Sequence, residues 1–369
     1  MVPTNPKTTH APLPVPEVAA EAFRARRGEL VNAVARRMDQ DSRLGEWVGS
    51  HSPRLMDSTR RHHAAFMGEV MAGNDARLLE QALAWVYATY HNQGVSFDFF
   101  LHEWKTWQEA IAGILPAREA EAILPIYEWM VQHHDELIEA AHQYRTRRAS
   151  VQPRWEDDYQ YIVDHLIQGD TTGVIDRCHG LLLDGMPYES LLQNLFYPAM
   201  VDVGARWEAG QLSVAMEHQT TAMVYRVLAA LYYDQPFPES DRGRGLVSPV
   251  SNEFHEMGSW MLAVSLELDG WDITLLTADT PPETLVATVL EERPRFVALS
   301  VTLVGNVGEA RSTVASLRAA LGPDDATPIV VGGQAFHEAP WLVQSVNADL
   351  HLESAMAAVA WARSLGAPR

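Results

Sequence analysis

Cysteine is nearly absent from this chain of 369 residues, in which Cys178 is the one example. A single thiol cannot form a disulfide within the chain, and such a composition is typical of the reducing cytoplasm. Long apolar runs are missing too, because no stretch reaches the roughly 18 apolar residues of a membrane-spanning helix. The first residues also lack the apolar centre of a signal peptide. We therefore expect a cytoplasmic protein that makes no membrane contact.

Positive charge is scarce. The chain has 28 Lys and Arg against 48 Asp and Glu, which gives a formal net charge of -20. A surface this acidic repels a phosphate backbone, so we expect no direct binding to DNA. Two local basic clusters, 24–27 and 145–148, are typical of solvated helix faces. The apolar share of 47% and the charged share of 21% are those of an ordinary globular protein.

The pattern divides the chain into four parts. Residues 1–16 contain five prolines and no regular periodicity, so we expect a disordered tail. Residues 17–148 show apolar residues at helical spacing and predict a helical sensor or interaction domain. Residues 154–235 are helical as well, and residues 244–369 alternate between short apolar runs and helices. This order predicts a multidomain α and α/β protein.

Turn and capping residues place the breaks within the helical parts. Asn74–Asp75 predicts the start of one helix and Gly94 its end, and Asp98 is a candidate cap for the next helix. Pro116 and Pro125 indicate further boundaries. In the second helical part, glycines near 169 and 185 leave room for four helices of ordinary length, which favours a four-helix bundle.

The carboxy-terminal part has the pattern of a parallel sheet. Strands alternating with helices predict a doubly wound, Rossmann-like domain with right-handed crossovers. The predicted helices lie at 262–268, 282–291 and 308–321. The predicted strands are 245–250, 271–276, 296–303, 329–331 and 349–352.

A metal-ligand signature follows the first of these strands. Glu253, His255 and Gly258 stand in the pattern acid-x-His-x-x-Gly within residues 253–258. Ligands of doubly wound folds bind at the carboxyl ends of strands, where a histidine can reach a metal. An acid two residues earlier can accept a hydrogen bond from the other ring nitrogen, which fixes the tautomer. The alternative is a helix-capping turn with an exposed histidine.

Two further features strengthen the pattern. About 45 residues after the signature, a strand ends in the hydroxyl residues Ser300 and Thr302, followed by Leu303. A later strand ends in the paired glycines Gly332 and Gly333. Both features fall where a strand is expected to meet a helix, as the histidine motif does.

Together these residues resemble the cobalamin-binding domain shared by methionine synthase, mutases and corrinoid carriers. The resemblance implies base-off cobalamin, with His255 as the lower cobalt ligand and Glu253 as its hydrogen-bond partner. It also implies that Ser300 and Thr302 face the buried base, although the family usually shows Ser-x-Leu. The implied cofactor-binding set in this domain is Glu253, Phe254, His255, Glu256, Met257, Gly258, Ser300, Thr302, Leu303, Gly332, Gly333 and Gln334.

The second helical part carries another spacing. Trp207 is followed by nine residues and then by Glu217 and His218. This spacing is similar to that of the light-sensing adenosylcobalamin receptors, in which a four-helix cap precedes the cobalamin domain. The resemblance implies that Trp207 packs over the upper ligand, that Glu217 hydrogen-bonds it and that His218 is a candidate upper cobalt ligand. The alternative is that Trp207 belongs to the core and Glu217 to the start of a helix.

These resemblances predict a cobalamin-binding light sensor that is not an enzyme. The usual receptors begin with a winged helix-turn-helix, which we do not find here, so we expect a protein as signalling partner. Caps of this family meet across symmetric interfaces, which implies a homodimer or higher oligomer. The upper ligand, adenosyl or another, stays open. The alternative function is a corrinoid methyl carrier that serves separate methyltransferases.

A related group, the photocobilins, combines cobalamin with biliverdin, which makes a bilin a candidate second chromophore. An open-chain tetrapyrrole needs aromatic walls and polar partners, although an aromatic stripe at helical spacing is more often core. Attachment through Cys178 is disfavoured, because a cysteine within a helix is usually an inert packed thiol. The candidate bilin contacts are Trp104, Trp107, Tyr127, Trp129, His133, His134, Tyr159, Tyr161, Tyr225, Tyr232 and Tyr233.

Overall fold

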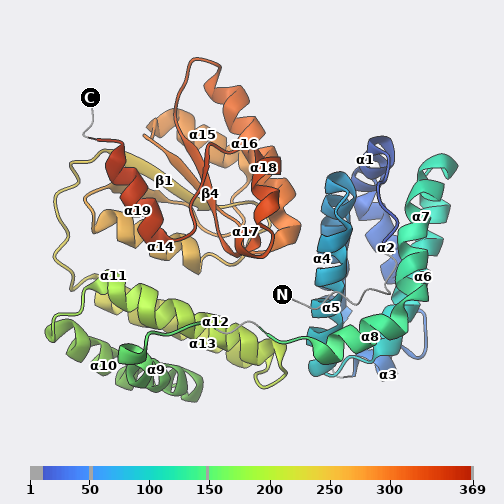
Figure 1. Cartoon of the computed structure of the whole chain (residues 1–369), viewed down its shortest axis with the longest axis horizontal. Coiled ribbons are helices and arrows are strands. Elements are labelled where there is room, and N and C mark those ends of the chain that lie inside the picture. The colour runs from blue at the N-terminus through green and yellow to red at the C-terminus, as the bar shows by residue number, and fades with distance from the viewer. Residues whose placement is uncertain (1–10, 50–52, 147–148, 367–369) are drawn as a thin grey trace. The chain divides into compact units, whose positions relative to one another are not determined.

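The computed structural model describes residues 11–49, 53–146 and 149–366. They group into two compact units, the first ending at Gln235 and the second beginning at Pro236. The segment His62–Glu69 groups with the second unit. Figure 1 labels the elements of both. Within the described residues, no helix is long and apolar enough to cross a membrane.

The first unit is helical throughout. Asp75 caps α5 by accepting a hydrogen bond from Leu78 N at 2.9 Å, as predicted. The predicted cap of α6 was wrong, because Ser96 is the N-cap and Asp98 lies in the first turn. Pro125 is not a boundary either, since it lies inside α7. The helices of the amino-terminal part are α1 Glu17–Ala25, α2 Arg27–Asp39, α3 Leu44–Val48, α4 Pro53–Gly73, α5 Ala76–Asn92, α6 Phe97–Ile114, α7 Ala117–Gln132 and α8 His134–Gln143.

The predicted tail is shorter than expected. Residues 1–10 lie outside the described residues. Ala11 and Val15 are buried, and their backbone N–H groups donate to Glu80 Oε1 at 3.3 Å and to Asn74 Oδ1 at 2.7 Å. Residues 11–16 therefore pack against the helical domain rather than forming part of a disordered tail.

The cap contains the expected four helical segments. Asp170 caps α10 through Gly173 N at 2.9 Å, and Ser213 caps α13 through Met216 N at 3.3 Å. The third segment consists of α11, a π-helical turn and α12 in direct succession. The cap elements are α9 Glu156–Gln168, α10 Thr171–Leu183, α11 Tyr188–Leu191, the turn Leu192–Phe196, α12 Tyr197–Glu208 and α13 Val214–Tyr232.

The second unit is the predicted doubly wound parallel sheet. Its strands lie in the order β2-β1-β3-β4-β5, and every neighbouring pair is parallel. The bounds are β1 Arg244–Pro249, α14 Met257–Glu267, β2 Asp272–Leu275, α15 Pro282–Glu292, β3 Val297–Ser300, α16 Val307–Leu321, β4 Ile329–Gly332, α17 Gln334–Glu338, α18 Val343–Val346, β5 Leu350–His351 and α19 Ala355–Ser364.

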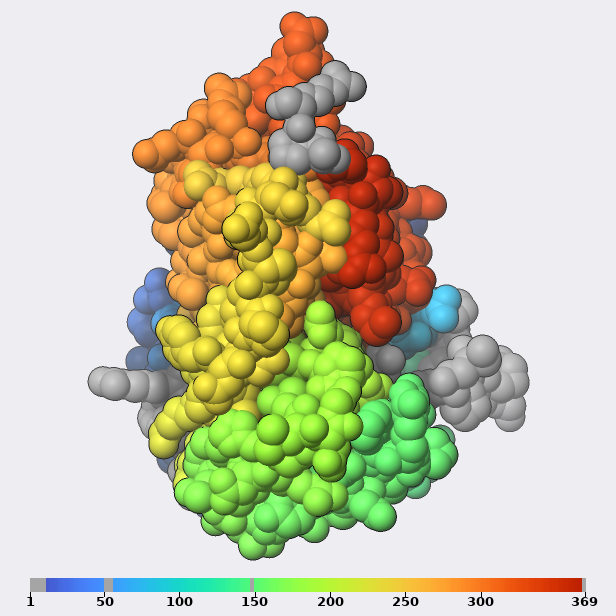
Figure 2. All heavy atoms as spheres, turned by 90° about the vertical axis from the view of Figure 1, so that its left-hand side faces the viewer, coloured from blue at the N-terminus to red at the C-terminus, as the bar shows by residue number. Residues whose placement is uncertain are grey.

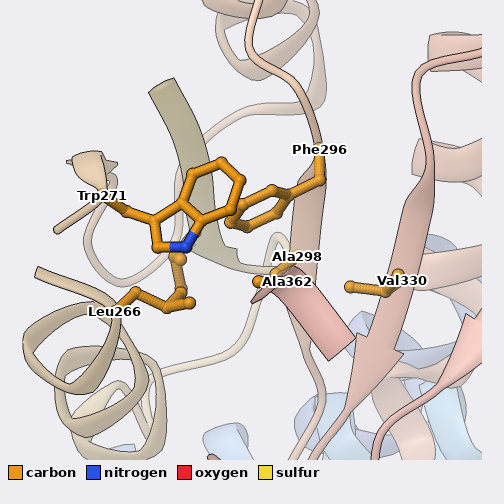
Figure 3. Close-up of a cluster of buried hydrophobic side chains, with 7 residues drawn as sticks. Leu266, Trp271, Phe296, Ala298, Val330 and Ala362 are labelled. Carbon is orange, nitrogen blue, oxygen red and sulfur yellow. The ribbon is translucent and has the colours of Figure 1, made fainter. Parts of the chain in front are cut away.

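Helices cover both faces of this sheet (Figure 1). On one face, Leu266 of α14 and Ala362 of α19 join the apolar cluster drawn in Figure 3. Trp271 and Phe296 lie at its centre, with ring centroids 5.0 Å apart and planes at 77°. On the other face α15 packs against α16. This covering on both sides explains why the strands read as apolar runs without alternation.

The segment 234–243 joins α13 to β1. It carries Pro236 and Pro238, and most of its residues are exposed. Figure 2, in which this stretch is yellow, shows it at the surface.

Candidate functional site

The sheet brings two loops together at its carboxyl edge. Strand order reverses between β1 and β3, which lie side by side with Pro249 paired to Ser300. The loops that follow these strands turn to opposite faces, and open α/β sheets bind their ligands at such a reversal of strand order. The histidine motif lies in the first loop and Thr302 and Leu303 in the second. The predicted strand 296–303 is shorter in the structure, because β3 ends at Ser300.

Glu253 and His255 form the pair that the motif predicts. Glu253 Oε1 lies 2.7 Å from His255 Nδ1 and accepts the backbone N–H of His255 at 3.1 Å. Glu253 is fully buried, whereas the His255 side chain is 57% exposed. The carboxylate is thus held within the protein while the imidazole reaches outward from the edge of the sheet.

The second oxygen of Glu253 ties the two loops to each other. Oε2 accepts the backbone N–H groups of Thr302 and Leu303, both at 2.9 Å, and the side-chain amide of Asn306 at 3.1 Å. Burial alone raises the pKa of this carboxyl, but the hydrogen bonds from His255, Leu303 and Asn306 outweigh it and hold the pKa below its ordinary value. Glu253 is therefore an anion at neutral pH.

This anion sets the chemistry of the imidazole. A carboxylate only accepts hydrogen bonds, so His255 Nδ1 must carry the proton that lies between them. The lone pair of the neutral ring then resides on Nε2, and the carboxylate raises the basicity of that nitrogen. Nε2 is the ring atom suited to bind a metal.

The start of α14 lies beside this histidine. Among the described residues, a Cβ added to Gly258 would have only Ser300 Oγ within 4 Å, at 4.0 Å, so the protein itself does not crowd this glycine. The next residue, Ser259, has a buried hydroxyl that finds no hydrogen-bond partner among the residues that the structure describes. Buried polar groups normally have partners, so this hydroxyl can receive a polar atom of a bound molecule. Phe254 adds an exposed apolar side chain, 64% accessible.

Other predicted residues of this domain already serve the protein itself. Gly333 has φ of +112°, and a Cβ there would overlap the backbone of Val301. A Cβ on Gly332 would lie 2.9 Å from Leu352 O. Glu256 Oε2 accepts the N–H of Ala278 at 2.7 Å. The close packing of the chain thus requires these glycines irrespective of any ligand.

The remaining predicted residues lie at the same edge. Met257 is the first residue of α14 and is half-buried, as are Thr302 and Leu303. Gln334 begins α17 and donates to Glu338 Oε1 at 3.1 Å.

The cap places its three predicted residues at the ends of two successive helices. Trp207 lies in the last turn of α12, and Glu217 in the first turn of α13, on either side of one short loop. Glu217 accepts hydrogen bonds from Thr221 Oγ1 at 2.9 Å and pairs with His218 Nδ1. The side chain of His218 is 75% exposed and Trp207 is half-buried. Trp207 is therefore not a core residue, in contrast to the fully buried Trp104 and Trp107.

Sequence reasoning missed two contributors to the histidine loop. Asn306 is buried and donates to Glu253 Oε2 and, at 3.1 Å, to the Asn252 carbonyl. Asp279 Oδ1 accepts the N–H of Asn252 at 3.0 Å. A signal for Asn306 exists, since an asparagine directly before α16 can bond locally or across the crevice. Nothing in the sequence indicates its partner 53 residues away.

Several of the candidate bilin contacts are core residues. Trp104, Trp107 and Tyr127 belong to the packed core of the amino-terminal domain, where Trp107 and Tyr127 stack at 6.1 Å. Cys178 is buried, and burial raises the pKa of its thiol to about 12. A thiol of this kind is a poor nucleophile at neutral pH, in agreement with the expectation for Cys178.

Comparison with known proteins identifies both parts of the carboxy-terminal half. A model described as "B12 binding domain" matches residues 243–360, and a second model of the same description matches residues 159–232. The first covers the sheet unit and the second covers the helices of the cap. The two matches thus coincide with the regions that carry the histidine and tryptophan motifs.

Two curated relatives come from Myxococcus xanthus. The HTH-type transcriptional repressor CarH is 34% identical over 154 residues, which cover 42% of this chain and 50% of the relative. The HTH-type transcriptional repressor CarA is 28% identical over 218 residues, which cover 58% of this chain and 71% of the relative. The chain thus spans half the length of the first relative.

A solved structure shares the fold. The monomethylamine corrinoid protein of Methanosarcina barkeri superposes with a TM-score of 0.51 at 16% identity, over 57% of this chain and all of that protein. The predicted fold class, a helical domain followed by a helical cap and a Rossmann-like sheet, is confirmed.

Proposed function

Because this chain belongs to the family of cobalamin-binding proteins to which CarH and CarA are related, we propose that it is a cobalamin-dependent light sensor. The observation that carries the proposal is the pairing of buried Glu253 with the outward-facing imidazole of His255 at 2.7 Å. A bound alkylcobalamin supplies visible absorption and a cobalt–carbon bond that light can break. Everything else in the proposal concerns the residues of this chain.

His255 Nε2 would be the protein's ligand to cobalt. Glu253 keeps the proton on Nδ1, and the bonds to Thr302 and Leu303 hold the carboxylate in place. Gly258 and Ser300 would lie beside the bound cobalamin, and the buried hydroxyl of Ser259 would donate to one of its polar atoms. Gly332, Gly333 and Gln334 border the same edge of the sheet.

The cap covers the upper face in this proposal. Trp207 packs its indole over the upper ligand, because an indole offers a large apolar area together with one N–H donor. Glu217 would hydrogen-bond the same ligand, and exposed His218 would be a second candidate ligand for cobalt. A sensor needs contacts that differ between its two states. Loss of the ligand beneath Trp207 supplies that difference.

The output is a change in protein association. The chain is strongly acidic, so we propose a protein partner and a homo-oligomer that rearranges, rather than direct contact with DNA. Relatives that are transcriptional repressors favour a regulator over an enzyme.

The test is an absorption spectrum of the protein loaded with adenosylcobalamin in the dark and recorded again after illumination, with light scattering on both samples. We expect the spectrum and the assembly state to change together. A matched pair of variants, His255→Ala at the site and His337→Ala at an exposed position of α17, separates specific binding from general damage. An unchanged spectrum and unchanged scattering after illumination contradict light sensing.

Two additional arms decide between related functions. A second sample receives biliverdin, and a bilin absorption band that survives gel filtration supports it as a second chromophore. A third sample carries methylcobalamin and is offered a corrinoid methyltransferase. Turnover there, with no response to light, favours the corrinoid methyl carrier, which uses the same Glu253 and His255 but leaves Trp207 and Glu217 without a role.

A further inference from the structure

The amino-terminal helical domain contacts the loop that carries Trp207. The carboxy-terminal end of α5 meets residues 207–212 of the cap through side chains that lie more than 100 positions earlier in the chain. Gln93 Nε2 donates to the carbonyl of Trp207 and, at 3.3 Å, to that of Leu212. Asn92 Nδ2 donates to the Glu208 carbonyl at 3.0 Å. These contacts lie within the first unit.

The contacts add donors to carbonyl groups at a helix end. Trp207 and Glu208 are the last residues of α12, where carbonyl groups lack the usual partner four residues further on. The Trp207 carbonyl also accepts the backbone N–H of Gly210 at 2.9 Å. The amides of Gln93 and Asn92 cap these carbonyls from another domain. The carboxylate of Glu208 adds a side-chain contact, because its Oε1 accepts the indole N–H of Trp85 at 2.9 Å.

Gly210 makes the approach possible. Its φ is +70°, and a Cβ at this position would overlap the carbonyl oxygen of Asn92. The loop backbone therefore lies directly against the last turn of α5, and only glycine permits both this backbone conformation and this proximity.

From this contact, α5 continues into the centre of the amino-terminal domain. Tyr87 is fully buried, and its hydroxyl accepts the indole N–H of Trp104 at 3.0 Å and lies 3.0 Å from His134 Nδ1. Tyr87 thereby joins α5 to α6 and α8. A buried network of this kind is close-packed and hydrogen-bonded, so it passes a displacement of α5 on to α6 and α8.

We infer that the amino-terminal helical domain responds, through α5, to the ligand on the corrin's upper face. Gln93 is the residue that positions the carbonyl end of the Trp207 turn. The inference rests on the proposed function, since it requires that Trp207 respond to the upper ligand. A shift of the Trp207 backbone that follows loss of that ligand moves or breaks the bonds from Asn92 and Gln93 to the carbonyls of Trp207 and Glu208. The amino-terminal domain is then the output module of the protein.

Hydrogen exchange, followed by mass spectrometry on the full chain, tests this inference. Three states are compared: without cobalamin, loaded with adenosylcobalamin in the dark, and loaded and illuminated. We expect the amides of 207–212 and those of the last turns of α5, 86–93, to change their exchange rates together. The absorption spectrum of the same samples reports separately on cobalamin binding and on the light response.

Three variants make the test specific. Gln93→Ala removes the donor, Gly210→Ala forces the loop away from Asn92, and Gln211→Ala changes an exposed glutamine of the same loop as the matched control. In the first two variants, we expect the exchange rates of α5 to be the same in all three states. In the wild type they differ between states by about tenfold or more, as expected when one or two hydrogen bonds form or break. Both keep the spectral response, and the control keeps both responses.

The outcomes separate the two proposals. A wild-type loop that responds while α5 does not overturns the inference and leaves the sensor proposal standing. The same is true if Gly210→Ala transmits the response as fully as the wild type does. An absorption spectrum that does not change on illumination refutes the light sensor alone. Hydrogen exchange in the unloaded and loaded protein still tests whether the loop and α5 are coupled. A chain that stays colourless with cobalamin refutes both.

Discussion

The substitution Glu253→Gln separates the charge of the buried carboxylate from its shape. The carboxylate accepts two N–H groups on Oε1 and three on Oε2. An amide keeps one oxygen, which the side with three donors, Thr302, Leu303 and Asn306, will take. Its NH2 group then faces His255, whose Nδ1 must become an acceptor. The proton moves to Nε2, and the ring is left in the tautomer that cannot ligate cobalt.

The expected loss follows from the role of this bond. Replacing a hydrogen-bond partner of a metal-bound histidine typically weakens metal affinity by about 10- to 100-fold. That range corresponds to about 1.4 to 2.8 kcal/mol of binding free energy. The size of the side chain is kept, so we expect the variant to remain folded.

Titration of the apoprotein with cobalamin, followed by absorption, measures this loss. We expect a weaker dissociation constant by that factor and a spectrum shifted toward cobalamin that keeps its own base. Glu283→Gln, the same change at an exposed position of α15, is the control, and its affinity stays at the wild-type value. Equal affinities and equal spectra for Glu253→Gln and wild type refute the role given to Glu253.

Three further predictions concern stability and reactivity. Gly333→Ala places a Cβ against the backbone of Val301 at a φ of +112°, so we expect a lower melting temperature, by several degrees, whether or not cobalamin is present; an unchanged melting curve contradicts it. Burial raises the pKa of Glu103 to about 7 despite the opposing charge of Arg60, so its contribution favours folding at low pH and is lost as the pH rises through 7. In urea titrations, the free energy of unfolding of the wild type should decline between pH 5 and about 8, and Glu103→Gln should remove this decline. If the two proteins show the same dependence on pH, the assignment to Glu103 is wrong. Since burial raises the pKa of Cys178 to about 12, alkylation at pH about 8 should be far slower in the native protein than in urea; similar rates would mean that the thiol is accessible.

Local patterns were read correctly from the sequence because their partners are near in the chain. Glu253 and His255 stand two positions apart, so their pairing follows from the turn at the end of β1. Asp75 caps α5 by accepting the N–H of Leu78, three residues later. The strands were recognisable because a parallel sheet buried on both faces needs continuous apolar runs.

Contacts across long stretches of chain could not be predicted in the same way. Asn306 reaches Glu253 over 53 positions, and Gln93 reaches Trp207 over 114. The sequence predicts a tail at residues 11–16 because their partners, Asn74 in the turn before α5 and Glu80 within α5, lie 59 and 69 positions away. Pro125 was read as a boundary, yet a helix held by packing tolerates one missing N–H. The paired glycines were assigned to a ligand, although the neighbouring backbone already requires them.

The central claim is that His255 Nε2 binds cobalt beneath the corrin, and it can be read from the metal itself. The measurement is the electron paramagnetic resonance spectrum of the Co(II) form of the loaded protein, prepared once with ordinary histidine and once with histidine labelled with ¹⁵N in the ring. We predict that the label changes the nitrogen splitting on cobalt from three lines to two, and that His255→Ala abolishes this sensitivity. A splitting that is identical in labelled and unlabelled protein would show that cobalt keeps the vitamin's own base, and would contradict the account.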